Sequence, residues 1–267
     1  MRTKFVSIFL LCASLWLAPP AIAGRNCDAE QPPKAATVER GLTLAERTLA
    51  ALDASGARVV ILARAGQDLS AYGLRYSHLG LAYQQPDGQG GHVWRVLHKL
   101  NQCGTPYAAI YRQGLGEFFL DDLWRYEAAW VVPTPEVQDR LLALLQDPAR
   151  ATRMHTKPYS LVSYAWGTRY QQSNQWAMET LASAMEPGAD SRPRAQAWLQ
   201  LKGYEPTGLH IGPLTRLGAR ATQANVAFDD HPNAKRFSDR IETVTVDSVF
   251  AWLQRAQLGQ VPVRLSL

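Results

Sequence analysis

The spacing of apolar residues predicts a chain that mixes helices with short strands. Between residues 36 and 54 they recur every three or four positions, the period of an amphipathic helix, at Val38, Leu42, Ala45, Leu49 and Leu52. Residues 58–63 form a short β-branched run, which indicates a buried strand. The same criteria predict further strands at 108–111, 128–132 and 242–246.

Helix starts are recognisable in the second half of the chain. Thr134 followed by Pro135 is typical of the first turn of a helix. Further helices are expected to begin at Ser173, at Ser191 and at Asp247. No repeat and no low-complexity tract interrupts this order, so the pattern predicts a single α+β domain.

A hairpin is the most informative predicted element. Residues 74–83 and 92–100 are expected to be strands, and the segment between them is dense in Gly, Pro and Asp. A turn centred on Gly88 places His78 directly opposite His98, with both side chains on one sheet face. Two facing imidazoles can form an orienting hydrogen bond, but two unrelated structural histidines fit the pattern at least as well.

The helix that begins at Ser173 is a second candidate feature. A hydroxyl at a helix N-terminus lies near free backbone amides and the positive end of the helix dipole, which suits a nucleophile. Ser and Asn are also the residues that most often cap helices, and Asn174 fits that role as well as Ser173 does. The pattern alone favours a plain cap and leaves the nucleophile open.

The first 23 residues have the composition of a cleaved export signal. Arg2 and Lys4 precede an apolar run, and the pattern Ala-Ile-Ala ends at Ala23. The run is shorter than the roughly 20 residues that a membrane span requires, and no later segment replaces it. We therefore expect residues 24–267 to be periplasmic or secreted, with a core at about 58–185 and a carboxy-terminal elaboration at about 187–267.

The charge balance argues against nucleic acid as a partner. Lys and Arg number 28 against 23 Asp and Glu, a net charge of +5. The expected signal carries two of these cations and no acid, so the mature chain keeps only +3, without a run of like charges. No phosphate-binding glycine loop and no clustered metal-ligand spacing is present, so neither cofactor nor metal is expected.

Export also changes the meaning of the cysteines. Cys27 and Cys103 remain after the signal is removed, and an even number of thiols in an oxidising compartment predicts a disulfide. The bridge closes a loop of about 75 residues. The alternative is a nucleophilic thiol, but neither cysteine begins a predicted helix, where a thiolate would be favoured.

Four segments resemble the NlpC-type papain-like hydrolases. Residues 76–83 resemble the strand that carries the catalytic histidine in that family, and residues 94–98 resemble the next strand, which ends in the third polar catalytic residue. Residues 157–159 (Lys-Pro-Tyr) resemble the segment before the nucleophile helix, and residues 173–177 resemble that helix. The segments follow the permuted order of the NlpC group. The whole mature chain also resembles domain of unknown function family 2145, secreted bacterial proteins for which the resemblance implies no activity.

The NlpC resemblance implies a papain-like antiparallel sheet packed on helices. It implies Ser173 as the nucleophile, His78 as the general base and His98 as the residue that orients His78. Tyr159 is expected near the oxyanion position and Trp176 in the substrate-binding part of the cleft. The implied substrate is an amide or ester bond, in cell-wall peptide or lipid.

Ser173 stands where the resembled family has cysteine, and this departure leaves two functions open. A serine hydroxyl is far less acidic than a thiol, so no resting ion pair forms and His78 must act as a true base. The chain is then either a hydrolase with a changed nucleophile or an inactive periplasmic binding or assembly module that uses the same cleft. The sequence does not separate these functions, and it leaves the oligomeric state open.

Overall fold

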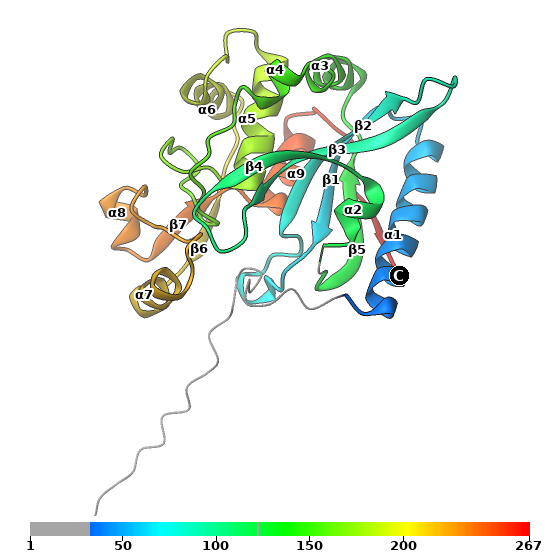
Figure 1. Cartoon of the computed structure of the whole chain (residues 1–267). Coiled ribbons are helices and arrows are strands. Elements are labelled where there is room, and N and C mark those ends of the chain that lie inside the picture. Colours follow the sequence, from blue (N-terminus) through cyan, green and yellow to red (C-terminus); the bar gives the residue numbers. More distant parts are fainter. Residues whose placement is uncertain (1–32, 122) are drawn as a thin grey trace, which may run out of the picture.

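An antiparallel sheet of six strands forms the centre of the computed structural model (Figure 1), which describes residues 33–121 and 123–267. Its strand order is β4-β3-β2-β1-β5-β8. The strands are β1 (Val59–Ala65), β2 (His78–Pro86), β3 (His92–Asn101), β4 (Ala108–Gly114), β5 (Arg125–Val131) and β8 (Val263–Ser266). The predicted α+β class is confirmed. The expected signal peptide and Cys27 lie outside the described residues.

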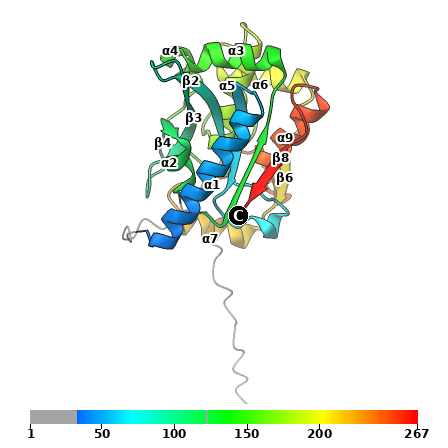
Figure 2. The ribbon, with the colours of Figure 1, turned by 90° about the vertical axis from the view of Figure 1, so that its right-hand side faces the viewer.

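Helices cover both faces of this sheet (Figures 1 and 2). One face packs against α1 (Ala35–Ala54) and α2 (Leu115–Phe119). The other face packs against α3 (Pro135–Leu145), α5 (Ser173–Met185) and α9 (Val246–Arg255). Alternate residues of β1 therefore enter two different cores, Val60 and Leu62 on one side and Ile61 and Ala63 on the other. This double burial is why β1 is a continuous apolar run.

The remaining elements lie around this core. A short 3-10 turn covers Ser70–Tyr72, and the short helix α4 (Pro148–Thr152) follows α3. Beyond α5 come α6 (Arg192–Leu201), β6 (Thr207–His210), α7 (Pro213–Thr222), α8 (Asn233–Arg236) and β7 (Arg240–Thr243). Strands β6 and β7 form a separate two-stranded sheet. Within residues 33–121 and 123–267, no helix combines the length and apolar character needed to cross a bilayer.

Helix α1 forms where it is predicted, but it presents a different face to the sheet. Leu42 and Leu49, expected to be buried, are 46% and 40% exposed. Ala45 and Leu52 are buried as expected, and the other buried positions are Gly41, Leu44 and Thr48. A Cβ on Gly41 would lie 2.9 Å from the backbone oxygen of Phe119, so the glycine allows α1 to approach α2 closely. That contact sets the rotation of the helix, and apolar spacing alone does not reveal it.

The carboxy-terminal segment differs from prediction in two ways. The expected strand at 242–246 is β7, which ends at Thr243, and α9 is capped by Thr245 rather than by Asp247 because the Thr245 hydroxyl accepts from the Ser248 N–H. Strand β8 was not expected, and it pairs with β5 at the end of the main sheet. Part of the segment expected to be an elaboration therefore completes the central sheet.

Candidate functional site

The two predicted histidines meet across the hairpin of β2 and β3. His78 Nε2 lies 2.9 Å from His98 Nδ1, and His98 Nε2 lies 2.7 Å from Gln113 Oε1 on β4. An amide oxygen can only accept, so His98 carries its proton on Nε2 and accepts at Nδ1. His78 must then donate from Nε2, which leaves its Nδ1 as a lone-pair acceptor. The structure thus fixes one tautomer for each ring.

The register of the hairpin differs from the predicted one by two positions. Strands β2 and β3 pair from Leu81 with Leu97 to Pro86 with His92. Continued along the strands, this register places His98 opposite Gly80, so the prediction of directly opposed histidines is wrong. The two rings are diagonal neighbours on the same face, with centroids 5.2 Å apart. A shift by an even number preserves the face, because side chains alternate along a strand.

The histidine pair occupies an apolar and positively charged environment. Phe118 of α2 packs against both rings, and Arg64 of β1 donates to the backbone oxygen of Phe118 and pairs with Asp121. Burial and the Arg64 guanidinium lower the pKa of His98 from 6.5 to about 4. Burial and the same cation hold the pKa of His78 well below its ordinary value. Both rings are therefore neutral at pH 7.

Ser173 has a different partner from the one the resemblance implies. Burial raises the pKa of Tyr159, and the neighbouring Ser173 side chain opposes that rise. Among the described residues, no hydrogen bond joins Ser173 to His78 or to His98. The expected nucleophile–base contact is therefore not formed, although Tyr159 does lie beside Ser173 as expected.

The capping alternative for Ser173 is also wrong. Helix α5 is capped by Gln172, whose side chain accepts from the Asn174 N–H at 3.1 Å. Ser173 is the first helical residue, and its side chain does not cap the helix. Gln is an uncommon cap, so the preference for Ser and Asn pointed to the following residues instead.

Asn174 attaches the start of α5 to the strand that carries His78. Its Oδ1 accepts from the Leu79 N–H at 2.9 Å, and its Nδ2 lies 3.4 Å from the backbone oxygen of Ser77. Ser173 precedes Asn174 in the chain and His78 precedes Leu79, so this hydrogen bond joins the two backbone segments that carry them. Their side chains nevertheless enter different surroundings: His78 packs against Phe118 of α2, whereas α5 packs against the opposite face of the sheet.

Trp176, expected to line a substrate cleft, is a core residue. Its side chain has no exposed surface and packs in the cluster that contains Leu79, Leu81 and Leu181. Its indole Nε1 has no hydrogen-bond partner. The physical reason is that α5 is buried on nearly all sides, so a large side chain one turn into the helix cannot reach solvent. Trp176 is therefore closed to solvent in this structure, and its predicted substrate-binding role stays a prediction.

Three contributors to this site escaped prediction from the sequence. Gln113, Phe118 and Arg64 come from β4, α2 and β1, and they meet only when the sheet is assembled. If the β3–β4 register had been known, Gln113 could have been placed near His98, because it is a diagonal neighbour of His98 across the two strands. Within the described part of the chain, no three His, Cys, Asp or Glu side chains gather as a metal site would require.

The comparisons with known proteins identify a family. A family model described as an uncharacterized protein conserved in bacteria, DUF2145, matches residues 51–253. No curated protein and no solved structure matches the chain. The match begins in α1 and ends in α9, so it includes the histidine pair and the start of α5. Because this match spans most of the sequence, the chain belongs to the DUF2145 family of uncharacterised bacterial proteins.

Proposed function

We propose that the protein is an exported, non-catalytic binding or assembly module with a papain-like fold of the permuted NlpC type. Support for the fold comes from the order of the segments and from the placement of α5. Its N-terminus is attached to the histidine strand through Asn174 and Leu79, as a nucleophile helix would be. Support for export comes from the basic, apolar and small-residue segments at 1–23.

One observation carries the non-catalytic assignment: among the described residues, no hydrogen bond joins the Ser173 hydroxyl to an imidazole, and the side chain that it influences is Tyr159. A serine acts as a nucleophile only when a base takes its proton, and the base must lie within hydrogen-bond reach. The side chains of the expected site are also closed to substrate, because Ser173, Tyr159 and His78 are at most 8% exposed and His98 is fully buried.

A hydrolase remains the second candidate because of the proton arrangement in the histidine pair. Gln113 and His98 hold His78 in the tautomer whose Nδ1 accepts, which is the form that a general base needs. Catalysis requires Ser173 to exchange Tyr159 for that nitrogen. It also requires a path for an amide or ester substrate past Phe118 or along the start of α5.

The substitution Ser173→Cys separates the two candidates. If the residue at 173 is not paired with His78, we expect the new thiol to react with iodoacetamide at pH 6 no faster than an unactivated cysteine. His78→Ala in the same background is then expected to leave the rate unchanged. Ser183→Cys is the matched control because it places a thiol on the same helix, away from the histidines. The rate of the wild-type protein is subtracted to correct for its own cysteines.

The opposite result supports the hydrolase. A thiol at 173 that reacts at least tenfold faster than the one at 183, and that loses this rate with His78→Ala, demonstrates an imidazole partner. Hydrolysis of any member of a panel of peptides and esters by the wild-type protein, abolished by Ser173→Ala, then establishes catalysis and overturns the non-catalytic proposal.

A further inference from the structure

Strand β8 is an open edge of the main sheet. Its pairing partner is β5, and within the described ranges no other strand pairs with it. The Leu267 N–H donates to the Tyr126 oxygen, which fixes the hydrogen-bonding alternation along the strand. By that alternation the N–H and C=O groups of Arg264 and Ser266 point away from β5. These groups form a short template for an added strand.

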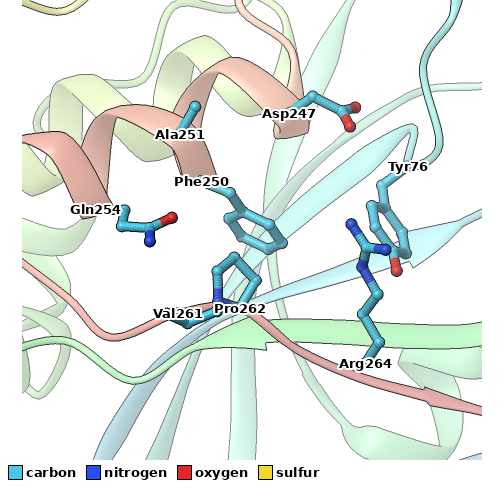
Figure 3. Close-up of a pocket in the computed structure, with 8 residues that line it drawn as sticks. All are labelled: Tyr76, Asp247, Phe250, Ala251, Gln254, Val261, Pro262 and Arg264. Carbon is cyan, nitrogen blue, oxygen red and sulfur yellow. The ribbon is translucent and has the colours of Figure 1, made fainter.

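A cavity of about 550 Å³ lies beside this edge, between β8 and α9 (Figure 3). Phe250 and Tyr76 supply aromatic surface, and Pro262 and Arg264 belong to the segment that forms the edge. The cavity is therefore placed to receive a side chain from a segment that pairs with β8, since alternate side chains of an added strand point to this face.

The cavity is lined by two opposite charges, Arg264 and Asp247, that do not form a direct ion pair with each other. No ion pair of Arg264 occurs among the described residues, and its guanidinium extends beside Tyr76 in Figure 3. Asp247 also faces the cavity, but it forms no ion pair with Arg264 and accepts from the Arg75 N–H at 3.4 Å. Arg264 thus lies on the edge strand itself, and among the described residues it forms no direct ion pair, although its charge opposes the rise that burial causes in the pKa of Asp247 across the cavity.

We propose that β8 binds an extended polypeptide segment that adds to the sheet as a further strand and carries an acidic side chain opposite Arg264. The outward backbone groups of β8 supply the main-chain hydrogen bonds, and the guanidinium supplies a bidentate site for a carboxylate. Asp247 lines the far side of the cavity and repels any second acidic side chain of the bound peptide. It therefore limits the direction in which the peptide runs along β8. This proposal does not depend on whether Ser173 is catalytic.

A second copy of the chain is a poorer occupant than an acidic peptide. An isologous β8–β8 pair brings two Arg264 guanidinium groups to one small interface, and like charges across strands destabilise pairing. The strand is also only four residues long, so a dimer through this edge alone buries little surface.

The test uses two fluorescein-labelled octapeptides with the full mature chain. Both alternate valine and threonine between terminal serines, and they differ only in a central glutamate or glutamine. We expect the glutamate peptide to bind about five- to tenfold more tightly by fluorescence anisotropy at low salt. We expect Arg264→Gln to remove that difference. Arg255→Gln is the matched control because it changes another exposed arginine outside the cavity.

The main-chain part of the proposal has its own variants. Ser266→Pro removes an outward N–H without removing a bond to β5, so it is expected to weaken both peptides, whereas Ser266→Ala is expected to bind normally. Hydrogen exchange is expected to show peptide-dependent protection at residues 264 and 266. Equal binding of the two peptides, no effect of Arg264→Gln, protection elsewhere, or a dimer by light scattering that Ser266→Pro dissolves would each overturn the proposal.

Discussion

The proton positions around His98 follow from the chemistry of its neighbours. Gln113 offers an acceptor on one side, so the proton of His98 lies there and its other nitrogen receives the proton of His78. The rings are buried beside the apolar side chain of Phe118 and near the Arg64 cation, so a positive charge on either imidazole is disfavoured. Both rings therefore stay neutral. The same features that would orient a base also make the pair a stable structural element.

The neutral pair predicts that stability falls in mild acid. The folded-state pKa of His98 is about 4, below the 6.5 of the unfolded chain, so the unfolded state binds the proton first as pH falls. The contribution of His98 is complete above pH 6.5 and is lost progressively from pH 6.5 to 4. Between pH 6.5 and 5 the loss is about 2 kcal/mol. His78, whose pKa is also lowered, adds a loss of the same sign.

Urea unfolding at pH 7.5 and at pH 5 measures this loss. The variant His98→Gln is expected to be less stable at pH 7.5 but to lose about 2 kcal/mol less than the wild type on acidification. His210→Gln, at an exposed position, is the matched control and should retain the wild-type pH dependence. An unchanged pH dependence in His98→Gln contradicts a neutral buried His98.

At the scale of elements, the pairing of β2 with β3 depends on a position without a side chain. Gly80 lies where the register places it opposite His98, and a Cβ there would be 2.4 Å from Val96 Cγ1 and 3.2 Å from the Phe118 ring. The missing side chain lets Phe118 reach both imidazoles and lets His78 reach His98 diagonally. One glycine thus connects the hairpin register, the packing of α2 and the histidine contact.

Gly80→Ala is therefore expected to lower the free energy of unfolding by about 1–3 kcal/mol, because the added methyl overpacks a closed core. Urea unfolding at pH 7.5 provides the measurement. Gly218→Ala is the control: it lies in α7, where an added Cβ meets nothing within 4 Å, and it is expected to be neutral or slightly stabilising. A wild-type stability for Gly80→Ala would contradict the close packing of Phe118 on the hairpin.

At the scale of the whole molecule, segments near residue 260 join the sheet and core that residues 59–185 form. Strand β8 extends the sheet beyond β5, and α9 packs into the same core as α3 and α5. The expected amino-terminal disulfide belongs to this scale too. Cys103 lies in the turn after β3, whereas Cys27 is outside the described residues, so the bridge stays a prediction.

Thiol titration tests that bridge. The unfolded, unreduced mature protein is expected to contain no free thiol, because the proposed export would expose Cys27 and Cys103 to an oxidising compartment. After reduction two thiols are expected. Removing the disulfide by Cys103→Ser is expected to lower the free energy of unfolding by about 2–4 kcal/mol, because the bridge restricts the unfolded chain over a long loop. Two reactive thiols before reduction would contradict the bridge.

Apolar spacing and turn residues determined most of the helices and strands on their own. The hairpin, β1, α3 and the start of α5 follow from periodicities and start residues that act within a few positions of the chain. Alternation along the strands also placed His78 and His98 on one face, because parity survives a register shift of two positions. These features are local, so the amino-acid sequence is sufficient for them.

Tertiary structure alone decided which residues meet. The rotation of α1 follows from the contact of Gly41 with α2, and the pairing of Ser173 with Tyr159 follows from how the 157–159 segment packs beside α5. Trp176 became core because α3, α6 and the strands β2 and β3 pack around α5. In each case the deciding contact joins segments far apart in the chain. Such contacts depend on packing between elements, which the period of one element does not specify.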